Sequence, residues 1–230
     1  YSSPSESKQN TYLAIAIISI IVIIAVILLI PKFHTPKIKT IDNLLDDATT
    51  EKDSATSFIY NGFSFVKKDG SWYTHIQNSL DLKTYTIAMH FSPKEVENIT
   101  IDGNLLDFLG RLHRINNLSS LDYQSYFTFD PIGTELSYIA VASGEMHTIL
   151  RDLSGIDIIA SCTNDNDPAC QKNTTQIITC ENTKEPVIFF KEANTTAIVI
   201  KDNCLTIQGT QYGLIRATDR LLYKFYGIVE

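Results

Sequence analysis

A charge-free apolar run at residues 11–30 constrains the fold of this 230-residue chain more than any other feature. The run reads TYLAIAIISIIVIIAVILLI, and Ser19 is the only polar residue between Leu13 and Ile30. A helix of about 20 residues rises roughly 30 Å, which matches the hydrocarbon thickness of a bilayer. A soluble amphipathic helix needs a polar stripe, and none recurs here at helical spacing. We therefore expect residues 11–30 to form a single transmembrane helix that binds the lipid bilayer.

Two other interpretations of the run are a cleavable secretory signal and the assembly helix of a pilin-like filament subunit. A signal peptide has an apolar region of about 7–15 residues before a small-residue cleavage site. This run is longer and continues into the sequence PKFH. A pilin helix continues amphipathically into its head domain, whereas Pro31 and Pro36 interrupt a helix here. We expect an uncleaved anchor and keep the filament subunit as an alternative.

The rest of the chain divides into segments of different composition. Residues 1–10 form a polar N-terminal segment. Residues 31–57 are rich in Thr, Asp and Lys with little apolar periodicity, which is typical of a stalk, with one short helical turn at residues 41–45. Residues 58–230 form the globular domain, which is long enough to bury a single hydrophobic core.

The four cysteines all fall in the C-terminal part of the chain, and this grouping indicates disulfides formed in an oxidising compartment. On proximity along the chain we favour the pairs Cys162–Cys170, which closes a polar loop, and Cys180–Cys204, which joins two predicted strands. A zinc site is the alternative. However, no cysteine pair has the two-to-four-residue spacing of zinc ligands, and no histidine follows His147.

The orientation in the membrane rests on two opposing signals. Lys8 precedes the apolar run and three lysines follow it closely, and the positive-inside rule alone would place the domain in the cytoplasm. The first residue is Tyr1 and not Met, so this count is incomplete. N-glycosylation sequons and the cysteines all follow the run, and we therefore place the domain outside the cytoplasm, as a glycoprotein. The sequon asparagines are Asn98, Asn117, Asn173 and Asn194.

The globular domain alternates strand and helix signals, which predicts an α+β or mixed α/β fold with a mixed sheet covered by at least two helices. Strand signals lie at residues 58–67, 72–77, 84–91, 99–101, 125–129, 156–160, 176–180, 187–191, 197–201 and 204–208. Apolar residues at helical spacing predict helices over 135–153 and 211–226, and residues 107–116 are ambiguous. The strand–helix–strand order over 125–160 predicts a parallel pair with a crossover helix.

No phosphate loop, dinucleotide fingerprint, nucleophile elbow or HExxH motif is present in the sequence. We therefore predict no catalytic, cofactor-binding or metal-binding residues and no cofactor.

Three groups of polar residues could be functional, but each also has an ordinary structural explanation. The acidic loop at residues 164–167 resembles a calcium loop, but it lacks the glycine and distal glutamate of an EF-hand. Ser143 and His147 share a helix face that also points to the core, and Arg216 with Asp219 predicts an ion pair on a helix surface.

The net charge of −7 argues against nucleic acid as a partner, because phosphate binding requires a basic patch. It also argues against adhesion to anionic lipid headgroups. We expect a protein or glycan partner on the outer face.

Aromatic residues are favoured at interfaces, although in strands they pack equally well in the core. The candidate aromatic surface comprises Trp72, Tyr73, Tyr123, Tyr126, Phe127 and Tyr226.

Three segments resemble a group of uncharacterised single-span membrane proteins of small-genome archaea. They read GLIRATDRLLYKFYGI, FIYNGFSFVKKDGSWYTHIQ and KDNCLTIQG. The resemblance covers most of residues 58–230, implies a membrane-anchored topology and supplies no catalytic residues. We predict a non-catalytic, membrane-anchored extracytoplasmic domain for recognition or cell-envelope assembly. The alternatives are a membrane-anchored hydrolase or metal-dependent enzyme with a dispersed site, and the pilin-like subunit.

Overall fold

The computed structural model describes residues 12, 15, 17–24, 39–50, 53–78, 81–117, 124–171 and 175–230. Its contacts divide the chain into two units, Tyr1–Thr40 and Ile41–Glu230. Residues 17–24 are helical, but much of the predicted span, together with the two prolines that follow it, lies outside the described residues. Within the described part of the chain, no helix combines the length and the apolar character that a membrane crossing requires.

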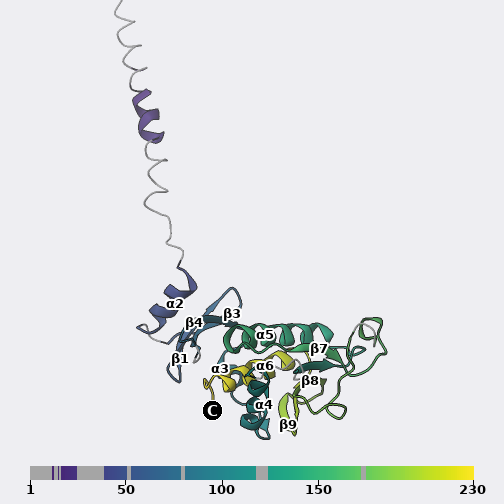
Figure 1. Ribbon diagram of the computed structural model, residues 1–230. Helices are drawn as coiled ribbons and strands as arrows, with labels where there is room; N and C mark the ends of the chain where they lie inside the picture. The colour runs from purple at the N-terminus through teal and green to yellow at the C-terminus, as the bar shows by residue number, and fades with distance from the viewer. Residues whose placement is uncertain are drawn as a thin grey trace, which may run out of the picture. The chain divides into compact units, whose positions relative to one another are not determined.

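The second unit contains a four-stranded antiparallel sheet in the order β1-β2-β3-β4 (Figure 1). The prediction of one strand over 58–67 is wrong, because Asn61 and Gly62 adopt positive φ angles and turn the chain into the β1–β2 hairpin. The hairpin predicted around Asp69 and Gly70 is confirmed. The strands are β1 (Ser57–Tyr60), β2 (Phe63–Lys68), β3 (Ser71–Gln77) and β4 (Thr84–Met89).

Helix α2 (Ile41–Ala48) packs on this sheet, where Leu45 and Ala48 are buried against Val66. Leu45 and Ala48 are three positions apart and therefore lie on the same face of the helix, the face that meets the sheet. The folded unit therefore begins at Ile41, inside the segment that the sequence predicts to be a stalk.

A second sheet has six strands in the order β5-β9-β10-β8-β6-β7. Strands β10, β8, β6 and β7 are parallel neighbours, β9 is antiparallel to β10, and β5 is parallel to β9, so the predicted mixed sheet is confirmed. The bounds are β5 (Ile101–Asp102), β6 (Tyr126–Phe129), β7 (Ile159–Cys162), β8 (Val187–Glu192), β9 (Ala197–Lys201) and β10 (Cys204–Gly209).

The crossover predicted over 125–160 is confirmed, because α5 (Leu136–Ser154) connects the parallel strands β6 and β7. The strand predicted at 156–160 begins three residues later, at Ile159. The residues before it still close helix α5, since Gly155 is left-handed and the N–H of Ile156 bonds to the carbonyl oxygen of Leu150. The strand predicted at 176–180 is wrong. Ile177 forms only an isolated bridge with Cys162, and the backbone hydrogen bonds of Gln176 and Ile178 to Cys162 do not continue into a ladder.

Helices α3 (Pro93–Val96), α4 (Leu105–Asn117) and α6 (Tyr212–Phe225) contribute buried residues to one shared hydrophobic core. The 3₁₀ turn η1 (Pro168–Cys170) precedes β8. Helices α5 and α6 lie side by side, and α6 also packs on β10 (Figure 1). The Tyr223 ring meets Phe65 of β2 edge to face, with centroids 5.7 Å apart. Helix α6 therefore joins the cores of the two sheets.

The predicted aromatic recognition surface is wrong for three of its members. Trp72, Tyr126 and Phe127 are buried. Tyr126 and Phe127 are consecutive in β6 and point to opposite faces of the sheet, and both faces are covered at this internal strand. Tyr73 and Tyr226 are half-buried, and Tyr123 lies outside the described residues.

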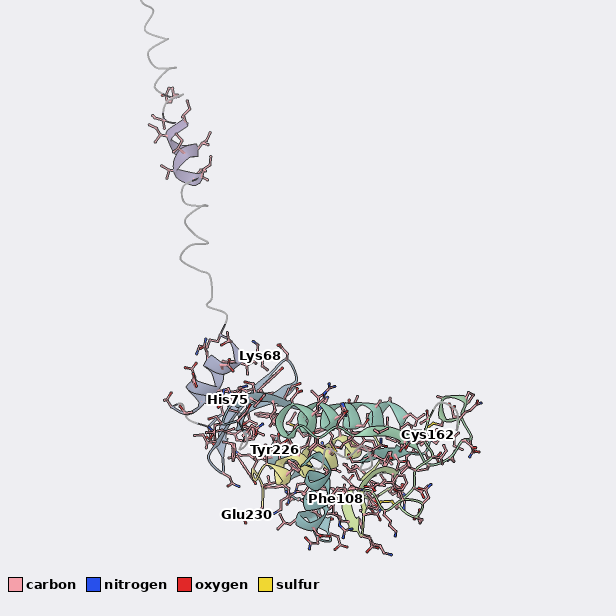
Figure 2. The ribbon with its side chains drawn as sticks, in the orientation of Figure 1. Lys68, His75, Phe108, Cys162, Tyr226 and Glu230 are labelled. Atoms are coloured by element: carbon pink, nitrogen blue, oxygen red, sulfur yellow. A yellow bond between two sulfur atoms is a disulfide. The ribbon has the colours of Figure 1, made fainter. Side chains whose placement is uncertain are left out.

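Both disulfides form with the predicted pairing. Cys162 at the end of β7 bonds to Cys170 of η1, and Cys180 bonds to Cys204 at the start of β10, with Cα–Cα distances of 5.9 and 5.4 Å. Cys180 lies in a turn and not in the predicted strand. Figure 2 shows Cys162 at the end of the unit opposite His75. Disulfides of this kind persist in oxidising compartments.

The polar features of the surface loops fit ordinary turn chemistry. In the acidic loop at 164–167, the Asn164 side chain accepts a bond from the Asn166 N–H, and Asp167 accepts one from the Ala169 N–H. Of the sequon asparagines, Asn98 and Asn194 are exposed. The side chain of Asn117 and all of Asn173 lie outside the described residues.

Candidate functional site

A groove of about 560 Å³ runs between strand β4 and helix α5. Four consecutive residues of β4, residues 85–88, line one wall. The other wall is one face of α5, with Val141, Gly144, Thr148 and Asp152 on successive turns. A groove lined by consecutive strand residues follows the backbone edge of the strand, because side chains alone would contribute only every second residue.

Among the described strands, none pairs with the edge of β4 on the side of this groove. β4 is the last strand of its sheet and pairs only with β3 among the strands that the structure describes. Helix α5 presents small or short side chains to the groove, since Ala140 and Gly144 are exposed and Val141 is 41% exposed. A strand edge without a partner, beside a helix face of mostly short side chains, is an arrangement that accepts another extended backbone.

Three side chains from different elements meet at the end of the groove. His90 follows β4 directly, Glu145 lies on α5, and Asp219 lies on α6. The Nδ1 atom of His90 lies 2.6 Å from Oε2 of Glu145. One ligand atom from each of the three side chains lies within 4.8 Å of the other two.

Backbone contacts fix the position of Asp219. The N–H of Phe91 donates a hydrogen bond of 2.7 Å to Oδ2 of Asp219. The hydroxyl of Tyr223, one turn further along α6, donates a bond of 2.7 Å to the carbonyl oxygen of Phe91. Both backbone polar groups of Phe91, its N–H and its carbonyl oxygen, are therefore bonded to side chains of α6.

Burial dominates the electrostatics of this cluster. Asp219 is fully buried and the side chain of Glu145 is 7% exposed, whereas that of His90 is 45% exposed. Burial, followed by the negative charge of Glu145, raises the pKa of Asp219 well above its usual value. The hydrogen bond to Glu145 raises the pKa of His90, because it favours the imidazolium form. Asp219 and His90 therefore both hold their protons more tightly than ordinary aspartate and histidine side chains do.

Comparison with known proteins supplies no relative of this chain, since no protein-family model, curated protein or solved structure matches it. The chemistry of the site is inferred from its own residues. An imidazole beside two carboxyl groups can transfer protons, orient a bound ligand or coordinate a metal ion.

Sequence patterns did not predict this cluster. The expected surface ion pair between Arg216 and Asp219 is wrong, since Asp219 is fully buried and the Arg216 guanidinium lies 4.6 Å from the centre of the Phe91 ring. One signal was present. Asp219 lies four residues after Ile215 and three before Leu222, which places a carboxylate on an apolar helix face.

The pair Ser143 and His147 is not joined by a hydrogen bond among the described residues. The Ser143 hydroxyl donates to the carbonyl oxygen of Ala140, one turn earlier in the same helix. The Nε2 atom of His147 lies 3.6 Å from Asp157. This geometry gives no nucleophile–base pair.

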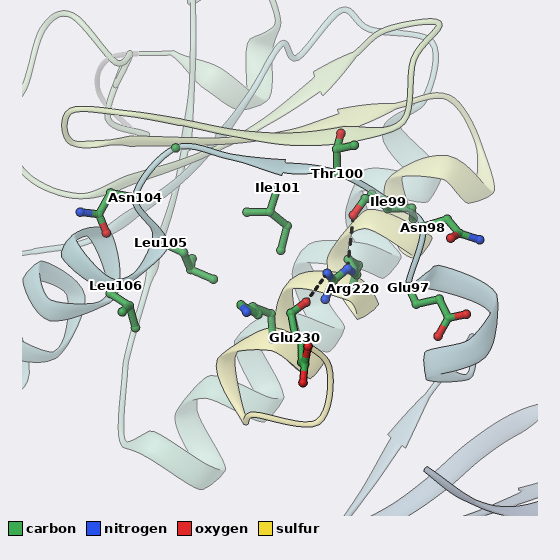
Figure 3. Close-up of a pocket in the computed structure, with 12 residues that line it drawn as sticks. Glu97, Asn98, Ile99, Thr100, Ile101, Asn104, Leu105, Leu106, Arg220 and Glu230 are labelled. Atoms are coloured by element: carbon green, nitrogen blue, oxygen red, sulfur yellow. Dashed lines mark hydrogen bonds between the residues drawn. The ribbon is translucent and has the colours of Figure 1, made fainter. Parts of the chain in front are cut away.

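A second cavity of about 690 Å³ lies where β5 and the start of α4 meet α6 (Figure 3). Arg220 borders it and donates from Nε to the carbonyl oxygen of Ile99 at 3.2 Å, and from Nη2 to that of Glu230 at 2.7 Å. Burial lowers the pKa of Arg220. Because the guanidinium is used to join two backbone segments, we assign Arg220 a structural role.

Proposed function

We propose that this chain is a single-pass membrane protein whose domain, outside the cytoplasm, recognises an extended polypeptide segment in the groove between β4 and α5. The apolar run at 11–30 supports the anchor, and the two disulfides and the exposed sequon residues Asn98 and Asn194 support the extracytoplasmic side. The observation that favours recognition is the unpaired edge of β4 along one wall of the groove.

The length of the groove sets the size of the recognised segment. Residues 85–88 extend over about 13 Å at the rise of a strand, and an added strand would pair with this stretch through its backbone. Side chains of the partner would alternate between the sheet side and the α5 wall. Short and β-branched residues suit a wall formed by Ala140, Val141 and Gly144.

Charge favours a basic residue in the partner. Asp152 is exposed at the groove and lies near enough to Tyr85 for its charge to affect that hydroxyl. At the other end, Glu145 is paired with His90. The net charge of the chain, −7, also attracts basic segments over longer distances. We therefore expect a lysine or arginine beside the Tyr85 end of the groove.

Peptide selection tests this proposal. The purified full chain in detergent is used to select binders from a phage-displayed library of random ten-residue peptides. We expect enriched sequences with alternating β-branched residues and a basic residue, because the groove offers a strand edge and an acidic end. Replacement of Gly144 by leucine should weaken the selected peptides at least about tenfold, as leucine fills the groove while favouring the helix.

The matched control is Gly110→Leu. Gly110 is also an exposed helical glycine, and a Cβ at either glycine meets no heavy atom within 4 Å, so both variants should fold. Gly110 lies on α4, away from the groove residues, and its variant should bind as the original chain does. Absence of enriched peptides, or equal binding by the two leucine variants, would contradict peptide recognition in this groove.

Thiol labelling tests the orientation. In intact cells, a membrane-impermeant maleimide should label the chain only after treatment with an impermeant reductant, because the four cysteines are paired in two disulfides. Labelling without reductant would show free thiols. Labelling that appears only after lysis would place the domain in the cytoplasm and overturn the orientation.

A second candidate function is a membrane-anchored hydrolase, which the bond between His90 and Glu145 favours. A carboxylate that holds Nδ1 leaves Nε2 as a general base, and the His90 side chain is 45% exposed beside the groove. The two candidates differ in the fate of a selected peptide. Recognition leaves its mass unchanged, whereas hydrolysis yields fragments that disappear with His90→Gln.

A further inference from the structure

The two carboxyl groups beside His90 have oxygens that lack a donor. Oε1 of Glu145 and Oδ1 of Asp219 are buried and accept no hydrogen bond from any group in the described part of the chain. Their partner oxygens are used, since Oε2 of Glu145 contacts Nδ1 of His90 and Oδ2 of Asp219 accepts the Phe91 N–H. Two buried carboxyl groups this close need a positive charge between them, which either a shared proton or a metal ion can supply.

The arrangement of these atoms fits a metal ion. One ligand atom each from His90, Glu145 and Asp219 lies within 4.8 Å of the others. Small movements of these side chains toward a shared ion would bring all three atoms to about 2.0–2.2 Å from it. An imidazole with two carboxylates is a ligand set for zinc and related divalent transition metals, whereas calcium and magnesium prefer oxygen ligands alone.

The surroundings also match such a site. The Phe91 N–H bonds to Oδ2 of Asp219 and leaves Oδ1 for a metal ion. Hydrogen bonds of this kind commonly orient the ligands of metal sites. Asp219 is fully buried, and both His90 and Glu145 line the groove. Three protein ligands at the wall of a groove leave a fourth position for water or a ligand, which is typical of catalytic and exchangeable sites.

We infer that His90, Glu145 and Asp219 bind one divalent transition-metal ion, of which Zn²⁺ is the probe we choose. This inference goes beyond the proposed function, because a peptide can pair with the β4 edge whether or not the ion is present. If both hold, the ion lies at the end of the groove and its open position faces the bound segment.

Metal titration tests the inference. The purified full chain in detergent is treated with a chelator, dialysed and titrated with Zn²⁺ in a calorimeter, and a parallel titration with Co²⁺ is followed in the visible spectrum. We expect one Zn²⁺ per chain and visible Co²⁺ bands of a four-coordinate site. His90→Gln should weaken Zn²⁺ more than the roughly 10- to 100-fold typical of an outer contact. Because the His90 side chain is 45% exposed, its replacement leaves no cavity in the core and the variant should fold.

Matched controls separate this site from surface histidines. His147 also lies near a carboxylate, with Nε2 3.6 Å from Asp157, and so does His75, 3.8 Å from Asp42. His147→Gln and His75→Gln should leave Zn²⁺ binding unchanged. Asp219→Asn should abolish the Co²⁺ bands, and circular dichroism shows whether this variant is folded.

Two results would overturn the metal site. One is the absence of Zn²⁺ and Co²⁺ binding by the folded chain. The other is binding that His90→Gln weakens no more than the control variants do. Peptide selection with chelator present measures the proposed recognition separately, so failure of either hypothesis is visible without the other.

Discussion

Replacement of Gly103 by alanine is expected to lower the free energy of unfolding by about 2–6 kcal/mol, and chemical denaturation of the full chain measures the loss. Gly103 has a φ of +104°, a region that L-residues rarely adopt, at a cost of about 1–3 kcal/mol. A Cβ there would also overlap the carbonyl oxygen of Ile200 and lie 2.9 Å from its Cβ. Overpacking of this kind costs about 1–3 kcal/mol more.

The strand pairing around Gly103 prevents its backbone from moving away from Ile200. Gly103 directly follows β5, whose residues Ile101 and Asp102 pair with Ile198 and Val199 of β9. The next residue of β9 is therefore Ile200, which stands against Gly103. Relief of the overlap would break the only pairing that β5 makes among the described strands.

Gly110→Ala is the control of opposite sign. Gly110 lies inside α4, and a Cβ there meets nothing within 4 Å. Alanine should therefore raise the free energy of unfolding by about 0.5–1 kcal/mol through helix propensity. If Gly103→Ala were as stable as the original chain, the close contact between the end of β5 and β9 would be wrong.

Removal of the Cys180–Cys204 disulfide by a double change to alanine should lower the free energy of unfolding by about 3.5 kcal/mol. The two cysteines are 24 positions apart, and the chain-entropy model gives this value for a closed loop of about 25 residues. Cys204 is also buried at the start of β10, where β8 and β9 pair on either side. Denaturation in urea or guanidinium measures the loss.

The other disulfide provides the comparison. Cys162 and Cys170 are eight positions apart, and the same model gives about 2.6 kcal/mol for removal of this pair. Both double variants replace two disulfide-bonded cysteines by alanine. They differ in the length of the loop that the disulfide closes and in where the cysteines lie relative to the sheet. A larger loss from the Cys162–Cys170 variant than from the Cys180–Cys204 variant would contradict this order.

Local patterns in the sequence predicted many of the elements. Helix α5 and strand β3 agree with their predicted ranges within a residue, because apolar periodicity and Asp-Gly turn chemistry act over short distances. The Asn-Gly pair at 61–62 is an equally strong hairpin signal, and its omission merged β1 and β2 into one predicted strand. The information for that turn was therefore in the sequence.

The candidate site was beyond such patterns for a physical reason. His90 and Glu145 are 55 positions apart, and Phe91 and Asp219 are 128 apart, so the fold alone brings them together. Each residue also has an ordinary local explanation, as a strand-end histidine or as charged residues on helices. The order of strands in the six-stranded sheet is likewise set by long-range packing, which no short window of the sequence contains.

The two hydrogen bonds that hold Phe91 have a consequence for binding in the groove. Its N–H and its carbonyl group both bond to α6, so the strand end before it is fixed to the centre of the core. The β4 edge that we propose for recognition is therefore preorganised, so most of the conformational entropy lost on binding would be that of the incoming segment. Affinity in this groove then depends on how extended the free partner already is.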